Sequence, residues 1–517
     1  MTSTLTPARA KPRPDRGGFG RLLHAEWTKF RTVRGWTASS IGAVLVICLV
    51  GLLATAAGNQ SGSDGSGALP VGPGGEAVND SFYFVHQPLQ GDGTITVSVS
   101  SLTGVVATDP AHNRTGLAPW AKAGIIVKDG LDQGSAYAAM MLTGAHGVRM
   151  QYDYTHDIAG PSGRAGREQP VWLRLQRSGD TVTGYQSADG TKWTETGSAR
   201  LPGLSATAQV GLFVTSPSVE EKTGTGTGFA PAVATGTFDQ VDLGGQWTAG
   251  SWQQVQVGDG AGTSGSYSQN TKGQAVPSGS GFAVTGAGDI APVVGGPATS
   301  GVRTIENFLV GAFAGLIIMV VVGAGYITVE YRRGLIGVTL AASPRRGRVL
   351  VAKALVVGTV GFLVGLVSAA VMVPLGGERS KANGFPVLTV PTGTELRVVV
   401  GTGLLLAVAG VLALAVGTVL RRSAVAITVV VVGMVLPYLL ATASVLPDGA
   451  SEWLLRVTPA AGFAILQSVA RYDQVVTVYA PGSGYFPLAP WSGFAVLCVY
   501  AAVAFAAAVV LLRRRDV

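Results

Sequence analysis

The sequence predicts an α-helical polytopic membrane protein with about six transmembrane helices and an inserted all-β sandwich ectodomain. The chain of 517 residues is 47% hydrophobic but only 13% charged, whereas a soluble domain carries about 25% charged residues. Its apolar residues are concentrated in runs long enough to cross a bilayer. One long polar stretch with strand-like alternation separates the first run from the others. The sequence therefore places a β-rich domain outside the membrane, between the first and second helices.

The apolar runs define the predicted spans. About 20 helical residues cross a hydrocarbon core of roughly 30 Å. The runs of that length are residues 36–57, 305–329, 349–375, 398–420, 424–446 and 489–512. Glu306 and Glu330 mark the two ends of the second run, because a carboxylate at the centre of a span would cost roughly 2.5–3.5 kcal/mol.

Basic residues in the short loops orient the chain, since Lys and Arg are enriched on the cytoplasmic side of a membrane. One side of the predicted spans carries a dense set: Lys29, Arg31, Arg34, Arg332, Arg333, Arg345, Arg346, Arg348, Arg421, Arg422, Arg513, Arg514 and Arg515. The other side carries a sparse set: Arg303, Arg379, Lys381, Arg397, Arg456 and Arg471. We therefore expect a multi-pass protein of the cell (plasma) membrane, with both termini cytoplasmic and residues 58–303 extracellular.

Residues 1–35 are predicted to form a cytoplasmic tail followed by an amphipathic interfacial helix. Within residues 19–34, apolar side chains recur at steps of three and four, and basic side chains fall between most of them. This pattern is typical of a helix that lies on the inner surface of a membrane. The alternative is a plain cytoplasmic extension of the first span.

The insert, residues 58–303, is divided into a β-sandwich (76–245) and a Gly/Ser-rich appendage (246–303). Short alternating segments such as 94–100 and 171–176 are separated by turn residues, which is the pattern of a sandwich. Four aromatic residues could stack on sugar rings in a ligand site, although such residues more often belong to the core: Trp120, Tyr152, Tyr154 and Trp193.

The sequence contains none of the common catalytic or cofactor motifs. It has no Gly-x-x-x-x-Gly-Lys-Ser/Thr loop for ATP phosphates, no Gly-x-Ser-x-Gly elbow and no His-Glu-x-x-His. The five histidines lack the spacing of a metal site, and both cysteines, Cys48 and Cys498, lie inside apolar runs. We therefore expect no catalytic residue, no metal and no cofactor. The Arg residues lie beside apolar runs, which favours lipid over nucleic acid as the partner of the basic charge.

Two segments, residues 22–34 and 326–353, together resemble ABC-2-type transporter permeases in the form common in actinobacteria. The resemblance covers residues 1–57 and 304–517. It implies that the interfacial helix and a coupling loop at 330–348 dock onto a separate ABC ATP-binding subunit, beside a second permease copy or a related permease. The residues carried over as the ATPase-coupling surface are Glu26, Trp27, Lys29, Arg31, Glu330, Tyr331, Arg332, Arg333, Pro344, Arg345 and Arg346.

The insert has a resemblance of its own. Residues 120–128, 135–138 and 187–193 resemble the jelly-roll, concanavalin A-like and laminin-G-like sandwiches of the DUF1349 kind.

The leading hypothesis for the whole chain is a permease subunit of an exporter. A membrane-anchored extracellular carbohydrate-binding or sensory module is the alternative, and a carbohydrate enzyme is a third. Five spans after the insert exceed what anchoring needs, and no carboxylate pair suited to a glycosidase stands out.

Overall fold

The computed structural model describes most of the chain. The described residues are 18–56, 69–107, 112–161, 170–223, 226–248, 250–258, 273–294, 302–337, 345–442, 446, 448–477 and 479–514.

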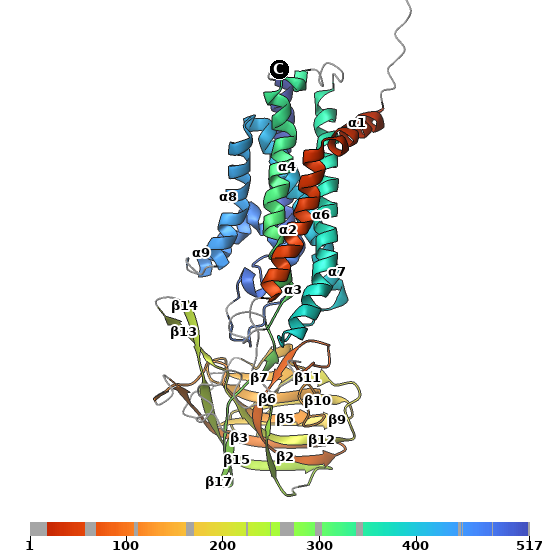
Figure 1. The fold of residues 1–517 in the computed structure, drawn as a ribbon. Helices are drawn as coiled ribbons and strands as arrows, with labels where there is room; N and C mark the ends of the chain where they lie inside the picture. Colours follow the sequence, from red (N-terminus) through yellow and green to blue (C-terminus); the bar gives the residue numbers. More distant parts are fainter. Residues whose placement is uncertain are drawn as a thin grey trace, which may run out of the picture.

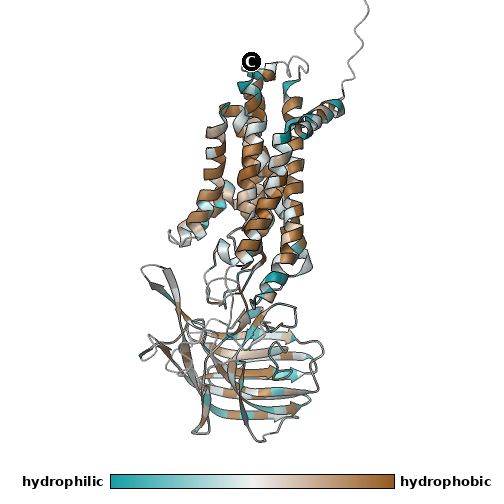
Figure 2. Ribbon diagram, in the orientation of Figure 1, coloured by the Kyte–Doolittle hydropathy of each residue, from teal (hydrophilic) through white to brown (hydrophobic). Residues whose placement is uncertain are grey.

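Six helices among the described residues are long and apolar enough to cross a membrane, which confirms the predicted number of spans. They pack side by side as a bundle (Figures 1 and 2). The spanning helices are α2 (Arg34–Ala56), α4 (Ala312–Arg332), α6 (Arg346–Ala382), α7 (Thr392–Leu420), α8 (Ser423–Thr442) and α10 (Pro490–Arg514). The remaining helices are α1 (Phe19–Thr32), α3 (Ile305–Phe308), α9 (Asp448–Val457) and the 3-10 helices η2 (Pro459–Leu466) and η3 (Pro481–Ser483).

The second predicted span is divided in two, because the chain forms the short helix α3 before α4 begins. Thr304 caps α3, with its backbone N–H donating to Asn307 Oδ1 at 2.8 Å. At the break, Gly311 lies so close to α2 that a Cβ atom there would be 2.2 Å from the Ile47 carbonyl oxygen. A glycine is therefore needed for this contact between the break and α2.

Small residues allow the central helices to approach closely. A Cβ atom at Gly323 on α4 would lie 2.2 Å from the Gly410 carbonyl oxygen on α7, and one at Gly365 on α6 would lie 2.6 Å from the Thr402 carbonyl oxygen. Close approach of this kind is the usual source of packing between helices in a membrane. Helix α7 consequently lies at the centre of the bundle, and α2 at its edge.

The insert is a β-sandwich, which confirms the predicted fold class. One sheet has the strand order β11-β10-β9-β3-β15-β18-β17 with β4 beside β3, and the other has the order β16-β2-β12-β5-β6-β7-β8. Val97 and Leu173 from the first sheet and Ile125 and Val210 from the second meet in the fully buried core. The strands of the first sheet are β3 (Gly93–Ala107), β4 (Asn113–Thr115), β9 (Val171–Ser178), β10 (Thr181–Ser187), β11 (Thr194–Arg200), β15 (Ala232–Gly245), β17 (Gln274–Ser278) and β18 (Gly281–Gly286). Those of the second are β2 (Phe82–Gln90), β5 (Lys122–Lys128), β6 (Tyr137–Thr143), β7 (Val148–Tyr152), β8 (His156–Ala159), β12 (Thr207–Thr215) and β16 (Gln253–Val257).

The boundary predicted at residue 245 is corrected by the structure. Strand β16 extends one sheet beside β2, and β18 pairs with β15 in the other. The segment expected to be a Gly/Ser-rich appendage thus completes both sheets. Short alternating stretches such as 253–257 carry the strands, and the abundant Gly and Ser between them obscured the pattern.

Two further strand pairs lie outside the main sheets. Strand β1 (Val78–Asp80) pairs antiparallel with β19 (Ile290–Pro292), and β13 (Val219–Thr223) pairs with β14 (Gly226–Ala230) in a hairpin. Val78 and Ile290 pack with Phe84, Ile126 and Phe213 in a second apolar cluster. The two ends of the insert therefore cover the outer face of the sheet that contains β5.

The β domain, which comprises β1 to β19, lies at one end of the bundle, and α1 and the C-terminus lie at the other end (Figure 1). We call these the β-domain end and the termini end. Gln474 Nε2 donates to the Tyr154 carbonyl oxygen at 3.2 Å, and Thr389 Oγ1 donates to the Gly75 carbonyl oxygen at 3.2 Å. An apolar docking cluster joins the two parts; it consists of Ala77, Val293, Val294, Val302, Leu388 and Val469. The β domain is thus docked on the bundle as well as joined to it by the chain.

Candidate functional site

Helix α1 packs against the termini end of the bundle at an angle to α2 (Figure 1). Its amphipathic pattern buries Glu26 and Phe30 and leaves Trp27 and Arg31 exposed. The helix ends at Val33, whose extended backbone (φ −81°, ψ 98°) turns the chain into α2. The buried stripe of this surface helix therefore contains a carboxylate that needs a partner.

Five side chains from α1, α4 and α6 form a charge cluster: Glu26, Lys29, Tyr326, Glu330 and Lys353. Lys353 Nζ donates to Glu26 Oε2 at 2.8 Å and to Glu330 Oε1 at 2.6 Å. Lys29 forms a further ion pair with Glu330. Two carboxylates thus face two ammonium groups, and the three helices are joined by charged hydrogen bonds.

Aromatic side chains surround this charge cluster. The Tyr326 hydroxyl donates to Glu26 Oε2 at 2.8 Å, and Lys353 Nζ lies 4.7 Å from the centre of the Tyr326 ring. The ring packs against Phe30 and Trp36, with ring centres 5.7 Å and 5.9 Å away. The Lys353 side chain is 0% exposed. In such a setting the cost of desolvation is offset only if every charge keeps its partner.

Neighbouring contacts join the other helix ends at the termini end. The Arg421 guanidinium lies 5.1 Å from the centre of the Tyr331 ring, which links the turn after α7 to α4. Arg421 ends α7 in the left-handed conformation (φ 56°). Arg346 Nη1 donates to the Leu512 carbonyl oxygen at 2.8 Å, which links α6 to α10. Contacts at this end thus join α4 and α6 to α1, α7 and α10.

The structure corrects the prediction for two of the coupling residues. Glu26 and Glu330 are 4% and 2% exposed and bond within the chain, so neither can contact a partner subunit directly. Lys29, also predicted to bind a partner, is partly exposed but points to Glu330. The ion-pair partners of Glu330 are Lys29 and Lys353 of the same chain.

The other predicted coupling residues lie on or near the surface. The exposed ones are Trp27, Arg31, Arg332, Arg333 and Arg345, while Tyr331 and Arg346 are partly buried. Pro344 lies outside the described residues, as does the rest of the segment 338–344.

Sequence reasoning missed Lys353 and Tyr326, although both left a signal. Lys353 is the one charged residue in the apolar run 349–375. Tyr326 precedes Glu330 by four residues, a spacing that places both on one face of a helix. A lone Lys near the end of a span, beside a polar pair on its neighbour, is a pattern that predicts a buried ion pair.

The four aromatic residues predicted as a possible ligand site of the β domain do not form one continuous surface. Tyr154 is fully buried, and its hydroxyl donates to Asp80 Oδ2 at 2.7 Å, so it is unavailable to a ligand. Burial raises the pKa of Tyr154, and the Asp80 carboxylate adds to the shift. The remaining three rings pack on different neighbours: Trp120 on His146 at 4.0 Å, Tyr152 on His156 at 4.2 Å, and Trp193 under the Arg174 guanidinium at 3.8 Å.

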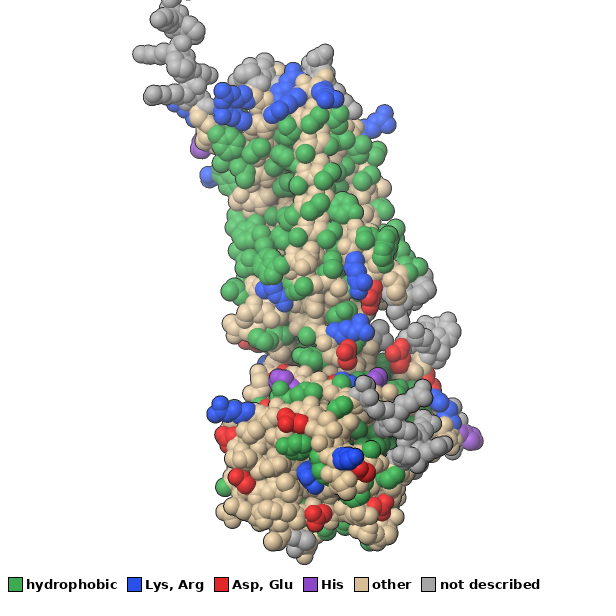
Figure 3. Space-filling model, turned by 180° about the vertical axis from the view of Figure 1, so that it is seen from behind, with side chains coloured by type: hydrophobic (Ala, Val, Ile, Leu, Met, Phe, Trp, Pro, Cys, Tyr) green, Lys and Arg blue, Asp and Glu red, His purple; other side chains and the backbone are tan. Residues whose placement is uncertain are grey.

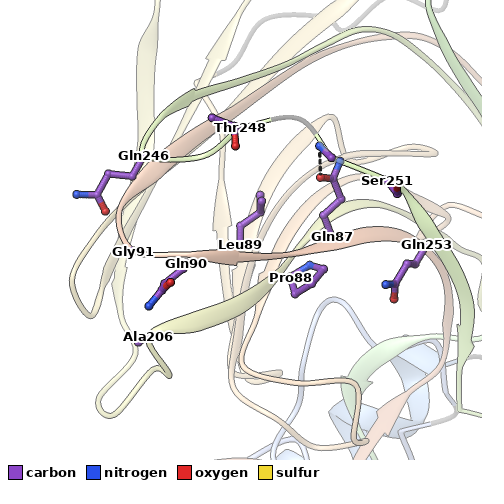
Figure 4. A pocket seen from close by; sticks show the side chains of 11 residues that line it. Gln87, Pro88, Leu89, Gln90, Gly91, Ala206, Gln246, Thr248, Ser251 and Gln253 are labelled. Carbon is purple, nitrogen blue, oxygen red and sulfur yellow. Dashed lines mark hydrogen bonds between the residues drawn. The ribbon is translucent and has the colours of Figure 1, made fainter.

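The β domain also contains an open groove of about 700 Å³ beside the end of β2 (Figure 4). Four glutamines line it together with small polar and apolar residues, and no charged side chain does so among the described residues; the glutamines are Gln87, Gln90, Gln246 and Gln253. Gln87 Oε1 already accepts from the Gly250 backbone N–H at 2.7 Å. The groove therefore offers amide hydrogen bonds but no acid–base pair.

The fold and the site define a multi-pass membrane protein whose helices are tied together at one end by buried charges. Within the described residues, no group of three or more His, Cys, Asp or Glu side chains could hold a metal ion. Residues 178–517 match the profile of the ABC-2 family transporter protein family. The match covers more than half of the chain, and the chain belongs to this family. Its members are membrane components of transporters rather than enzymes.

Similarity to individual proteins is much weaker. No curated protein matches the chain significantly. A functionally unknown protein from Saccharomyces cerevisiae is 17% identical, with a TM-score of 0.21, over 35% of this chain and 84% of that one. Scytalido-glutamic peptidase with a transition state analogue inhibitor is 12% identical, with a TM-score of 0.27, over 42% and 100%. SCP-B, of the Eqolisin family of peptidases, is 12% identical with a TM-score of 0.22, over 42% and 100%. TM-scores this low carry no functional argument.

Proposed function

We propose that this permease subunit belongs to an ABC exporter that is powered by ATP hydrolysis in a separate ATP-binding subunit. The observation that carries the proposal is the charge cluster of Glu26, Lys29, Tyr326, Glu330 and Lys353. It joins a surface helix and the exposed residues Arg332 and Arg333, which follow Glu330, to the bundle. A cluster that only anchored the protein would need neither buried carboxylates nor a surface helix.

We propose that the termini end is cytoplasmic and that the β domain is extracellular. Lys and Arg side chains gather at the termini end of the surface (Figure 3). The exposed ones that flank the spans are Arg31, Arg34, Arg332, Arg333, Arg345, Arg348, Arg422, Arg513 and Arg514. An excess of basic residues beside spans favours the cytoplasmic side of a membrane.

The proposed coupling route starts at the surface and ends in the bundle. Arg332 and Arg333 follow Glu330 directly and are exposed, so a partner that binds them would pull on the last turn of α4. Through Glu330, the movement reaches Lys353 on α6 and Lys29 on α1. Packed helices respond to such a pull by rigid-body shifts rather than by bending.

We further propose that a second permease, either a copy of this chain or a related one, completes the transporter within the lipid bilayer. Helix α2 exposes a row of apolar side chains, including Ile41, Leu45 and Leu49 at 62%, 63% and 57%. Lipid tails or an apolar face of another span suit such a surface.

Charge reversal at the loop should release the ATP-binding subunit. We expect Arg332→Glu with Arg333→Glu to reduce co-purification of that subunit at least about tenfold, because loss of about 1.4 kcal/mol is tenfold in binding. The control is Arg422→Glu with Arg514→Glu, which makes the same charge change on exposed residues elsewhere at the termini end. Retention of the ATPase by the first variant, or equal loss in both, would contradict the assigned loop.

Protease accessibility checks the proposed orientation. Protease added to intact cells stripped of their wall should cut within residues 58–303 and leave tags on both termini protected. The basic residues at the termini end are the reason for this expectation. The matched control is permeabilised cells, in which both tags should be lost. Cleavage of either tag from outside intact cells would reverse the orientation.

A further inference from the structure

The chain between α9 and α10 enters the bundle instead of staying at its surface. All residues of η2 after Pro459 are buried. The Phe463 ring lies 4.8 Å from that of Phe313 on α4 and 5.2 Å from that of Tyr438 on α8. Gly462 lies against Leu497 on α10. Since Phe313 is in the first turn of α4, η2 fills the space between the spans in the half of the bundle nearer the β domain.

Arg397 on α7 holds the end of η2 from one side. Its Nη1 donates to the Ile465 carbonyl oxygen at 2.9 Å, and its Nη2 donates to the Gln467 carbonyl oxygen at 2.6 Å. Carbonyl groups at the C-terminal end of a helix lack partners within the helix and carry partial negative charge. One guanidinium group therefore satisfies two acceptors that would otherwise need water.

Glu306 on α3 holds Ser468, which follows Gln467, from the other side. Ser468 donates its backbone N–H to Glu306 Oε1 and its hydroxyl to Oε2, both at 2.7 Å. Gly484 (φ 84°) lies against this carboxylate, and a Cβ atom there would be 2.9 Å from Oε2. Both carboxylate oxygens of Glu306 thus accept hydrogen bonds from the segment that follows η2.

We propose that Glu306 and Arg397 are positioning residues that hold η2 in place as the closure of the transport pathway at the β-domain end. This inference rests on the proposed function. Glu306 lies just before α4, and Glu330 of the charge cluster lies near the other end of the same helix. A shift of α4 against α7 separates the two groups that hold residues 465–468. The freed charges are then hydrated, which favours an open, water-filled state over a partly open one.

The test measures how readily a thiol reagent reaches η2 in the full chain, reconstituted in vesicles without nucleotide or partner. Cys48 and Cys498 are replaced by Ala, and Ala460, which is fully buried in η2, is replaced by Cys. The probe is a charged, membrane-impermeant methanethiosulfonate added on the β-domain side. Glu306→Gln and Arg397→Gln should each raise the labelling rate about ten- to a hundredfold, the range expected for losing a hydrogen bond to a charged group. Glu306→Asp and Arg397→Lys, which keep the charge, should restore much of the protection.

Two controls separate a local closure from general loosening. Arg379→Gln removes an exposed charge at the end of α6 and should leave the rate unchanged. A Cys at Ala508, which is buried on α10 toward the termini end, should stay unreactive in every variant. Unchanged labelling at residue 460 in both Gln variants, or equal rises at 460 and 508, would overturn the proposal. Because no ATP is present, this result is independent of whether the ATPase partner is correctly assigned.

Discussion

Replacing Lys353 by Met should destabilise the full-length protein more than the loss of any exposed basic residue. Lys353 is fully buried and donates to Glu26 and Glu330. Its removal leaves two carboxylates close together in an apolar setting, with Lys29 alone to balance them. Breaking a buried ion pair by deleting one partner costs about 3–5 kcal/mol. We expect a lower unfolding temperature in detergent and much less protein in the membrane.

The matched control is Lys381→Met, which removes the same charge from an exposed position in the last turn of α6. It should change the unfolding temperature little, because exposed charges contribute about 0–1 kcal/mol. Adding Glu26→Gln and Glu330→Gln to Lys353→Met should recover most of the stability but not transport. A Lys353→Met variant as stable as the Lys381→Met control would show that the charge cluster is not a joint of the bundle.

The spans could be predicted from the sequence because each depends on its own residues. A run such as 398–420 is apolar over the length that a membrane requires, and helix α7 covers it. The division of the second span into α3 and α4 was not predictable in the same way. At the break, Gly311 meets the backbone of α2 at Ile47, a residue of the first span that is far away in the sequence.

The sequence indicated polar segments at residues 26–31 and 330–346, but not which of their side chains point into the bundle. Glu330 and Arg332 both belong to a polar segment beside a span, and that segment by itself gives no reason for one to turn inward. The difference is decided by Lys353 on another helix, which needs a carboxylate partner. The position of η2 was not predictable for the same reason. Its apolar sequence would suit any buried segment, and the contacts that fix its end come from Arg397 and Glu306 on other helices.

Replacing Asp80 by Ala should have a comparable effect in the β domain. Asp80 Oδ2 accepts from Lys128 Nζ at 2.8 Å, from the Tyr154 hydroxyl at 2.7 Å and from the Gly134 backbone N–H at 2.9 Å. Asp80, Lys128 and Tyr154 are all buried. The variant therefore leaves an ammonium group buried without its counter-ion, at a cost of about 3–5 kcal/mol. Asp242→Ala, on the exposed part of β15, is the matched control and should have little effect.

The pH dependence of the Asp80→Ala variant gives a second and sharper check. Burial already lowers the pKa of Lys128, and Asp80 opposes that shift. Without Asp80 the folded-state pKa should fall further below the unfolded-state value. Between these two values the unfolded state binds more protons, so the stability of the variant rises with pH. Its deficit relative to the native protein should therefore shrink from about pH 7 to about pH 10.

Hydrogen exchange of the full-length protein can follow this effect strand by strand. In the Asp80→Ala variant, peptides that contain β1 and β5 should exchange faster, since Asp80 joins those two strands through Lys128. The peptide that contains Gln474 should also exchange faster, because this side chain donates to the Tyr154 carbonyl oxygen. Asp80→Leu combined with Lys128→Met and Tyr154→Phe should restore protection, because apolar groups can replace a buried ion pair at little cost. If only β1 and β5 lose protection, Asp80 stabilises the sandwich alone; if the Gln474 segment loses it too, the buried pair also holds the β domain on the bundle.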